Sequence, residues 1–267
     1  MWDPLVYQRF GDERSRPFYE LVGRVGADAP DHIVDLGCGP GNLTVTLADR
    51  WPQASVQGLD SSADMVRSAQ ELPQARSGKV TFAVADARDW TPPAGTDVLV
   101  SNAVLQWVAG HRELLGGWVD ALHSEAWLAF QVPGNFDGPS HQLLYELVAS
   151  PHWTSILGGP VRDRGLVFEP ADYADDLLAR GCSVDAWETT YLHLLPALDG
   201  EPHPVLAWME GTALRPVKAA LAGKPDGRRH WDEFRAQLAA RLAVAYPARH
   251  GVVAFPFRRI FVVAQKR

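Results

Sequence analysis

Short apolar runs rich in β-branched residues alternate with longer amphipathic stretches along the first half of the chain. The runs predict strands, and they cover residues 33–36, 55–59, 79–85, 97–101 and 127–132. Between them apolar residues recur at helical spacing, as at Leu43, Leu47 and Trp51, and the predicted helices cover residues 42–50, 62–72 and 111–123. Strands that alternate with helices are typical of an α/β fold, a doubly wound and mostly parallel sheet covered by helices.

The rhythm changes after Pro133, where prolines and glycines separate further helical stretches. Helices are predicted over residues 141–149, 171–180, 205–222 and 231–246, an extended segment over 183–195, and a last strand over 252–264. We expect a single domain, with an N-terminal lid segment at 1–30, a cofactor-binding core at 31–133, helical insertions at 134–180 and 196–250, and the last strand within 251–267. Helical insertions between late strands commonly cover the ligand crevice, so these two are predicted to form a substrate lid.

Composition and charge narrow the class of protein. The 267 residues are 46% hydrophobic and 21% charged, which is globular, and the net charge of -7 argues against an extended nucleic-acid surface. No apolar run approaches the roughly 18 residues of a membrane span. Cys38 and Cys182 stand far apart without metal-ligand spacing, so neither a disulfide framework nor a metal site is expected. The N-terminus lacks the pattern of a signal peptide, which favours the cytoplasm.

The most informative stretch is a predicted strand that runs into three alternating glycines and then a helix. It reads Val34-Asp35-Leu36-Gly37-Cys38-Gly39-Pro40-Gly41-Asn42. Glycines tolerate positive φ and let a ligand lie against the backbone, and the N-terminus of the following helix offers unpaired N–H groups. This is the pattern of a nucleotide-type cradle.

An acidic residue follows at the distance that a ribose needs. Asp60 ends the next strand, 60 - 41 = 19 residues after the last glycine, where a carboxylate can accept both ribose hydroxyls. The loop reads Gly-x-Gly-x-Gly, whereas a dinucleotide fingerprint needs Gly-x-Gly-x-x-Gly. The glycine spacing therefore argues against a dinucleotide-dependent oxidoreductase.

The loop resembles motif I of class I S-adenosylmethionine-dependent methyltransferases, a family with a seven-stranded Rossmann-like sheet. The resemblance implies that Asp35 lies near the methionine part of the cofactor and that the three glycines pack against its sugar and amino-acid portions. It further implies that Asp86, with the following Ala87, reads the adenine edge. Asn102 and Trp107, after the fourth strand, would surround the transferable methyl group. Ser61 and Met65 follow Asp60 as further cofactor candidates, and Met65 fits the core equally well.

Similarity to trans-aconitate 2-methyltransferases, one branch of that family, runs over nearly the whole chain. The matching segments are Trp2-Asp3-Pro4 to Tyr7, Glu13-Arg14-Ser15-Arg16-Pro17, the glycine loop, Arg50-Trp51-Pro52, Asp60-Ser61-Ser62, Leu105-Gln106-Trp107, Thr189-Thr190-Tyr191 with His193, Gly211 to Pro216, and Phe255-Pro256 with Arg259-Ile260-Phe261. Residues 151–168 match least. The implied reaction is methylation of a carboxylate of trans-aconitate, which gives a monomethyl ester and S-adenosylhomocysteine. The small tricarboxylate is then the expected partner of a monomer or weak homo-oligomer.

A carboxylate acceptor is already ionised at neutral pH, so no general base is expected and no residue is assigned a catalytic role. Positioning and removal of water would supply the catalysis. A tricarboxylate needs cationic and hydrogen-bonding partners, arginine above all. The candidates are Tyr7, Arg16, Tyr191, His193, Arg215 and Arg259. Arg258 and Arg259 should point to opposite faces of a strand, so at most one serves the site.

Two other functions remain open on the sequence. A related methyltransferase would act on another small carboxylic acid or on a malonyl-type thioester, and an apolar channel in place of clustered arginines would favour it. A non-catalytic module would bind S-adenosylmethionine as a sensor or scaffold, which intact ligand loops at Asp35, Asp60 and Asp86 permit.

Overall fold

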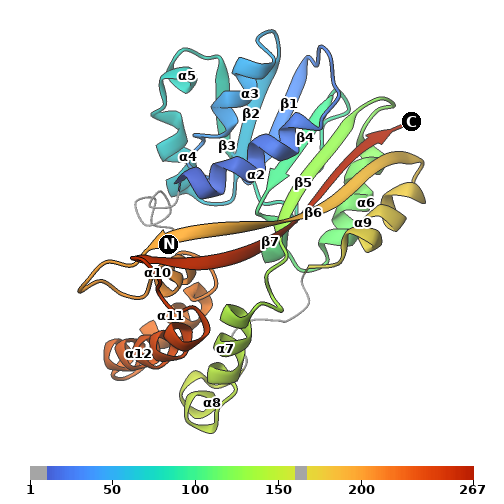
Figure 1. Ribbon diagram of the computed structural model, residues 1–267. Coiled ribbons are helices and arrows are strands. Elements are labelled where there is room, and N and C mark those ends of the chain that lie inside the picture. The colour runs from blue at the N-terminus through green and yellow to red at the C-terminus, as the bar shows by residue number, and fades with distance from the viewer. Residues whose placement is uncertain (1–10, 160–166) are drawn as a thin grey trace. The chain divides into compact units, whose positions relative to one another are not determined.

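A seven-stranded sheet organises the computed structural model, which describes residues 11–159 and 167–267 (Figure 1). The strand order is β3-β2-β1-β4-β5-β7-β6. The strands are β1 (His32–Leu36), β2 (Ser55–Asp60), β3 (Val80–Val84), β4 (Val98–Asn102), β5 (Trp127–Pro133), β6 (Cys182–Pro196) and β7 (Val252–Lys266).

Strands β1 to β5 pair in parallel, and β7 runs antiparallel to β5 with Phe130 opposite Val262. The predicted doubly wound, mostly parallel, seven-stranded sheet is therefore confirmed. From β1 the chain moves outward to β2 and β3, then returns to the other side of β1 with β4 and β5. The order reverses between β1 and β4, and ligands of such sheets bind at the carboxyl ends of the strands beside this point.

The helices lie between the strands and in two later blocks. They are α2 (Gly11–Gly23), α3 (Thr44–Arg50), α4 (Ala63–Gln70), α5 (Pro73–Arg76), α6 (His111–Ala121), α7 (Pro139–Val148), α8 (Pro151–Leu157), α9 (Pro170–Leu178), α10 (Pro204–Glu210), α11 (Arg215–Ala222) and α12 (Gly227–Ala245), with a 3-10 turn at Leu105–Trp107. None of the helices in the described ranges is long and apolar enough to cross a membrane.

One prediction about the helices is wrong. Residues 205–222 form two helices, α10 and α11, rather than one, because α10 ends at Glu210, just before Gly211, and Pro216 occupies the first turn of α11. Proline has no N–H and its ring clashes with the preceding turn, so it begins a helix more readily than it continues one. Helix α12 also begins at Gly227, ahead of the predicted 231.

The chain divides into two compact units, and the described residues of each have a core of their own. Unit 1 comprises Met1–Pro133, Leu166–Thr189 and Arg259–Arg267, and unit 2 comprises Gly134–Gly165 and Thr190–Arg258. In unit 1, Phe130, Val132 and Ile260 belong to a buried cluster on one face of the sheet, together with Trp118 of α6 and Tyr173 of α9. Alternate residues of each strand point to opposite faces, so the odd-numbered positions of β5 face the other side.

Helix α2 packs against β5 (Figure 1). Its buried residues Phe18, Leu21 and Val22 recur at helical spacing. Just after the helix, Gly26 lies so close to the Trp127 ring that an added Cβ would stand 3.0 Å from it. Trp127 is an odd-numbered position of β5, so α2 covers the face opposite the α6 and α9 core.

Unit 2 has an aromatic core under α12. Trp153 packs edge-to-face on Phe234 with ring centroids 5.0 Å apart, and its Nε1 donates to Gln237 Oε1 at 3.0 Å. The Tyr246 hydroxyl accepts from the backbone N–H of Ser140 at 3.0 Å, which joins the end of α12 to the start of α7. Aromatic burial with satisfied polar ends gives this unit a defined interior.

Candidate active site

The glycine loop lies at the carboxyl end of β1, beside the reversal of strand order. Gly37, Gly39 and Gly41 have φ values of +84°, +56° and +80°, a region that residues with a Cβ rarely adopt. The backbone N–H groups of Gly37 and Cys38 both donate to the Leu59 carbonyl, at 2.6 and 2.9 Å, which holds the loop against β2. The loop predicted from the sequence therefore has the expected position and backbone conformation.

The three glycines differ in what surrounds them. A Cβ added at Gly37 would stand 2.0 Å from Val104, and one at Gly41 would stand 2.7 Å from the Phe82 ring and 2.8 Å from Ala69. A Cβ at Gly39 would meet nothing within 4 Å. Gly37 and Gly41 are thus required by the packing of the protein itself, whereas Gly39 borders open space.

Asp60 ties this loop to the next one. Its Oδ2 accepts from the Gly39 N–H at 2.9 Å and its Oδ1 accepts from the Ser62 N–H at 2.8 Å. A carboxylate oxygen carries two lone pairs, so each oxygen keeps a second acceptor position. Ser62 caps α4 by accepting from the Met65 N–H, while Ser61 is exposed. The carboxylate is half-buried and can both hold the loop and accept ligand hydroxyls.

Asp35 is buried beneath the loop. Its Oδ2 accepts from the Thr44 hydroxyl at 2.6 Å, so the end of β1 is joined to the first turn of α3. Burial raises the pKa of Asp35 to about 7, the Thr44 hydrogen bond opposes this, and the charge of Asp60 adds to it. Because its side chain is only 3% exposed, Asp35 acts on the loop through its hydrogen bond with Thr44.

Asp86 lies just after β3 and is held by Arg88. The Arg88 Nε and backbone N–H donate to Asp86 Oδ1 at 2.9 and 3.0 Å, and Nη2 lies 2.5 Å from Oδ2. These hydrogen bonds lower the pKa of Asp86 to about 2, so the carboxylate is ionised and remains an acceptor. The following residue, Ala87, is buried, and so is Met65 on α4.

Two buried side-chain oxygens lie at and just after the end of β4. The Asn102 Oδ1 and the Gln106 Oε1 are buried, and neither has a hydrogen-bond partner among the described residues. Ala103 between them has φ +59°, a strained conformation for a residue with a Cβ. The Gln106 Nε2 donates to the Ala103 carbonyl at 2.6 Å, and Trp107 is half-buried at the end of the turn. Buried acceptors that lack partners are uncommon, and they mark a place where a ligand donor fits.

Arg259 is the best-defined of the arginine candidates. It is 5% exposed, on β7 opposite Pro133 of β5, and its Nη1 donates to Gln131 Oε1 at 3.1 Å. Arg258 is half-buried, and its backbone N–H donates to Asn135 Oδ1 at 3.5 Å. Gln131 was missed in the sequence, although it is the one polar residue inside the apolar run 127–132.

Three further acceptor candidates lie in unit 2. Tyr191 and His193 are buried on β6, with nearly parallel rings, and His193 stacks on Trp208 with centroids 4.9 Å apart. Arg215 begins α11 and is half-buried, and burial lowers its pKa. Trp208 joins Tyr191 and His193 in one aromatic group, a relation that the sequence did not reveal.

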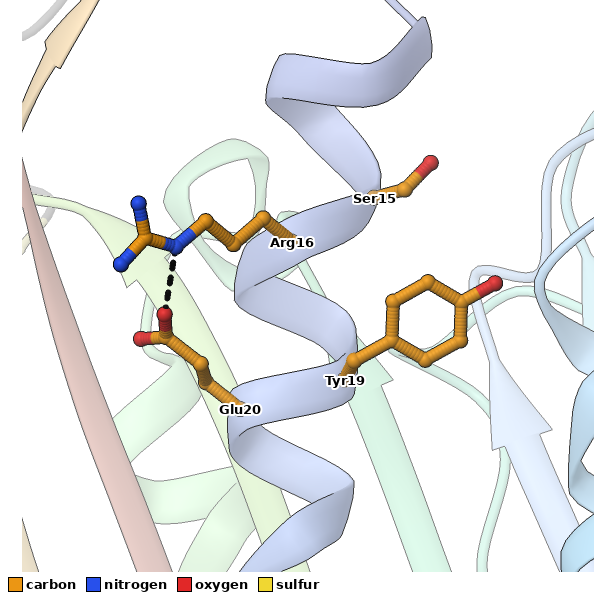
Figure 2. A pocket seen from close by; sticks show the side chains of 4 residues that line it. All are labelled: Ser15, Arg16, Tyr19 and Glu20. Carbon is orange, nitrogen blue, oxygen red and sulfur yellow. Dashed lines mark hydrogen bonds and ion pairs between the residues drawn. The ribbon is translucent and has the colours of Figure 1, made fainter.

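Arg16 lies on the exposed side of α2, where Ser15, Arg16, Tyr19 and Glu20 border an open surface hollow (Figure 2). Its Nε donates to Glu20 Oε1 at 2.7 Å. Figure 2 shows Arg16 and Glu20 on one side of the helix and Ser15 and Tyr19 on the other. An exposed pair of this kind opens at little cost. Tyr7, the partner proposed for Arg16, lies outside the described residues.

No group of three His, Cys, Asp or Glu side chains suited to a metal ion occurs within residues 11–159 and 167–267. Cys38 and Cys182 are free and buried, and burial raises the pKa of both thiols.

Comparison with known proteins agrees with this arrangement. Residues 33–125 match the family model described as a methyltransferase domain. The chain is 54% identical to trans-aconitate 2-methyltransferase from Rhodococcus jostii (strain RHA1) and 52% identical to the protein of that name from Mycobacterium sp. (strain KMS), with 99% of both chains covered in each case. Among solved structures, the YcgJ protein from Bacillus subtilis has a similar fold, with a TM-score of 0.57, 14% identity, and coverage of 96% of this chain and 99% of that one. The chain therefore belongs to the trans-aconitate 2-methyltransferase family, within the S-adenosylmethionine-dependent methyltransferases.

Proposed function

We propose that this chain transfers a methyl group from S-adenosylmethionine to a carboxylate of trans-aconitate, which gives a monomethyl ester and S-adenosylhomocysteine. The observation that carries the proposal is the sequence identity of 54%, over 99% of the chain, with the trans-aconitate 2-methyltransferase from Rhodococcus jostii. The polar and glycine-rich loops at the carboxyl ends of β1, β2 and β4 support it, because they suit a cofactor of nucleoside and amino-acid parts.

The residues around the loop fit S-adenosylmethionine on three counts. Gly39 borders open space, so a ligand can lie against its backbone. Asp60 keeps acceptor positions for ribose hydroxyls, and the unpartnered Asn102 Oδ1 is an acceptor for an ammonium group. The other residues proposed for the cofactor site, either as contacts or as supports of the loops that form it, are Asp35, Gly37, Gly41, Ser61, Met65, Asp86, Ala87 and Trp107.

When bound, S-adenosylmethionine would supply an electrophilic methyl carbon, to which the acceptor oxygen would form its new bond while the electron pair of the carbon–sulfur bond stays on the sulfur of S-adenosylhomocysteine. The acceptor carboxylate, with an ordinary pKa near 4, is ionised at neutral pH, so the chain need not remove a proton. Its residues have two tasks: they orient the carboxylate and they exclude water from it.

Recognition of the acceptor falls to cationic and hydrogen-bonding side chains. The residues proposed for it are Tyr7, Arg16, Tyr191, His193, Arg215 and Arg259. Arg259 has the strongest support, because it is almost fully buried at the carboxyl end of β5 and oriented by a neutral side chain. An arginine fork binds a carboxylate through two charge-assisted bonds.

The test is the formation of S-adenosylhomocysteine from S-adenosylmethionine with trans-aconitate, cis-aconitate, citrate and a malonyl thioester as separate acceptors. We expect trans-aconitate to have the highest kcat/KM. Preference for the thioester would move the acceptor to a carried acyl group. Tight cofactor binding without turnover on any acceptor would contradict the proposed activity and favour a binding module.

A further inference from the structure

Three polar side chains from neighbouring strands lie on the same face of the sheet at its carboxyl edge. Asn102 of β4 is opposite Gln131 of β5, and Arg259 of β7 is opposite Pro133, two residues beyond Gln131. Residues directly opposite in a sheet, and residues two apart on one strand, point to the same face. Asn102, Gln131 and Arg259 therefore form one polar group, here called the edge triad.

The edge triad is separate from the main core of unit 1. Phe130, Val132 and Ile260, which precede or follow its members by one residue, point into the apolar cluster on the opposite face. The triad instead lies on the face that α2 covers, the face of Trp127. Polar side chains on this face cannot be explained as part of the α6 and α9 packing.

Gln131 has the least expected environment in the triad. Its side chain is fully buried, and its Oε1 accepts from Arg259 Nη1 at 3.1 Å. Its Nε2 has no hydrogen-bond partner within the part of the chain that the structure describes. An unmade hydrogen bond at a buried amide donor costs free energy, and this cost is explained if the donor bonds to a ligand when one is bound.

We propose that Gln131 is a positioning residue for Arg259, and that the pair binds a carboxylate of the acceptor other than the carboxylate that is methylated. The proposal rests on the function proposed above. Gln131 Oε1 fixes the plane of the guanidinium, and its Nε2 adds a donor beside it, so both groups present N–H donors to one anion.

The charge of the pair explains why a carboxylate that does not react is the better occupant. Gln131 is neutral, so it orients Arg259 without cancelling its positive charge, as a glutamate would. An oxygen that accepts charge-assisted bonds from a guanidinium has less electron density for attack on a methyl group. The carboxylate bound here is therefore held for recognition, while another carboxylate of the same molecule reacts.

The experiment compares Gln131→Leu and Gln131→Glu with the wild-type protein. Leucine removes both hydrogen-bonding groups, and glutamate keeps the acceptor for Arg259 but adds a negative charge. Gln265→Leu is the matched control, because Gln265 is on the same face of β7 opposite Trp127, where it bonds to Glu125. The measurements are kcat and KM for trans-aconitate and the dissociation constant of S-adenosylhomocysteine by calorimetry.

We expect both Gln131 variants to raise the KM for trans-aconitate about tenfold or more, the size of a lost bond to a charged group, with kcat and cofactor affinity within about threefold of wild type. The control should change none of these values. Gln131→Glu should impair the enzyme at least as much as Gln131→Leu, although it keeps the bond to Arg259, because it repels the anion.

Truncated acceptors identify which carboxylate is bound. Itaconate, mesaconate and cis-glutaconate each correspond to trans-aconitate without one of its three carboxylates. Their KM, or their inhibition constant where turnover is slow, is measured on all variants. For the one that lacks the bound carboxylate, the Gln131 variants should differ from wild type by threefold or less. An unchanged KM for trans-aconitate, an equal loss on all four acceptors, or a loss of cofactor affinity would overturn the role of Gln131. A wild-type protein without activity on trans-aconitate would instead overturn the proposed function, and this inference with it.

Discussion

Asp60 combines two tasks in a single side chain. Its two oxygens hold the backbone N–H groups of Gly39 and Ser62, so the carboxylate shapes the loop before any ligand arrives. The sequence predicted its position and its acceptor role, because an acid at the end of the second strand is a pattern with a known mechanism. Its bond to Gly39 could not be predicted, since it depends on how the loop folds back toward β2.

We expect Asp60→Ala to weaken S-adenosylmethionine binding about tenfold or more, because hydrogen bonds to a charged group are worth roughly 1.5–3 kcal/mol. The dissociation constant is measured by calorimetry. Asp185→Ala is the control, since Asp185 is exposed and its pair with Arg24 spans 3.6 Å. Equal affinities for Asp60→Ala and wild type would contradict the role in cofactor binding.

Asp35 links protonation to stability. Burial raises its pKa from 3.8 to about 7, so the folded protein keeps a proton that the unfolded chain loses in this interval. The contribution of Asp35 to the free energy of unfolding is therefore full below about pH 4, falls as the pH rises toward 7, and is lost above that value.

The free energy of unfolding should therefore decline more steeply between pH 4.5 and 6.5 in the wild type than in Asp35→Asn, by about 1.4 kcal/mol per pH unit for one full proton. Urea unfolding at several pH values without ligand provides the measurement. Asparagine can still accept the Thr44 bond, so the variant should fold. Parallel curves for the two proteins would show that Asp35 ionises normally.

At the scale of elements, the glycine loop separates packing from ligand access. All three glycines have positive φ, yet only Gly39 borders open space. A methyl group there strains the backbone slightly and lies where the cofactor is proposed to bind. A methyl group at Gly41 would collide with the Phe82 ring and Ala69.

We expect Gly39→Ala to lose cofactor affinity about tenfold or more while its stability falls by only about 1–2 kcal/mol, the cost of a left-handed residue with a Cβ. Gly41→Ala should lose about 2 kcal/mol or more of stability, since overpacking adds to that strain. Gly78→Ala is the matched control, with φ +75°, nothing within 4 Å of the added Cβ, and a position in the turn before β3. Calorimetry and denaturant unfolding distinguish the three variants. Normal cofactor binding by Gly39→Ala would contradict the proposal that the cofactor occupies the open space beside Gly39.

The elements that could be predicted from the sequence are those in which the apolar pattern and the flanking turn residues indicate the same element. Strands β1 to β5 are short apolar runs that end in turn residues, and the structure confirms them within a few residues. Helix α2 was not predicted, because Pro17 interrupts a polar segment whose only apolar stripe is Phe18, Leu21 and Val22. Its helical state depends on packing against β5, a tertiary contact that no local pattern contains.

Gln131 shows the same limit within the site. A single glutamine in an apolar run indicates that something polar lies nearby, but its partner Arg259 is 259 - 131 = 128 residues away in the chain. Only the antiparallel pairing of β5 and β7 brings the two together. Motifs of adjacent residues were therefore predictable, whereas side chains joined by the sheet register were not.

For the whole molecule, we expect ligand binding to increase the free energy of unfolding. A ligand that binds only the folded protein stabilises it by about 2.7 kcal/mol when present at a hundredfold excess over its dissociation constant. S-adenosylmethionine and S-adenosylhomocysteine should raise the Tm by several degrees, and NADH at the same concentration should leave it unchanged. Thermal melts followed by circular dichroism test this, and stabilisation by NADH would restore the dinucleotide alternative.

The division into two units has a consequence for how this protein can change over generations. The chain passes between the units after Pro133, Gly165, Thr189 and Arg258, and the last two passages lie inside β6 and β7. A single crossover between two genes cannot exchange one unit for another, because each unit is encoded by separate stretches of the gene. An exchange would also have to join the two halves of β6 and of β7 without shifting the pairing of either strand. We therefore expect new acceptor preferences in this lineage to arise by point substitutions and not by recombination of whole modules.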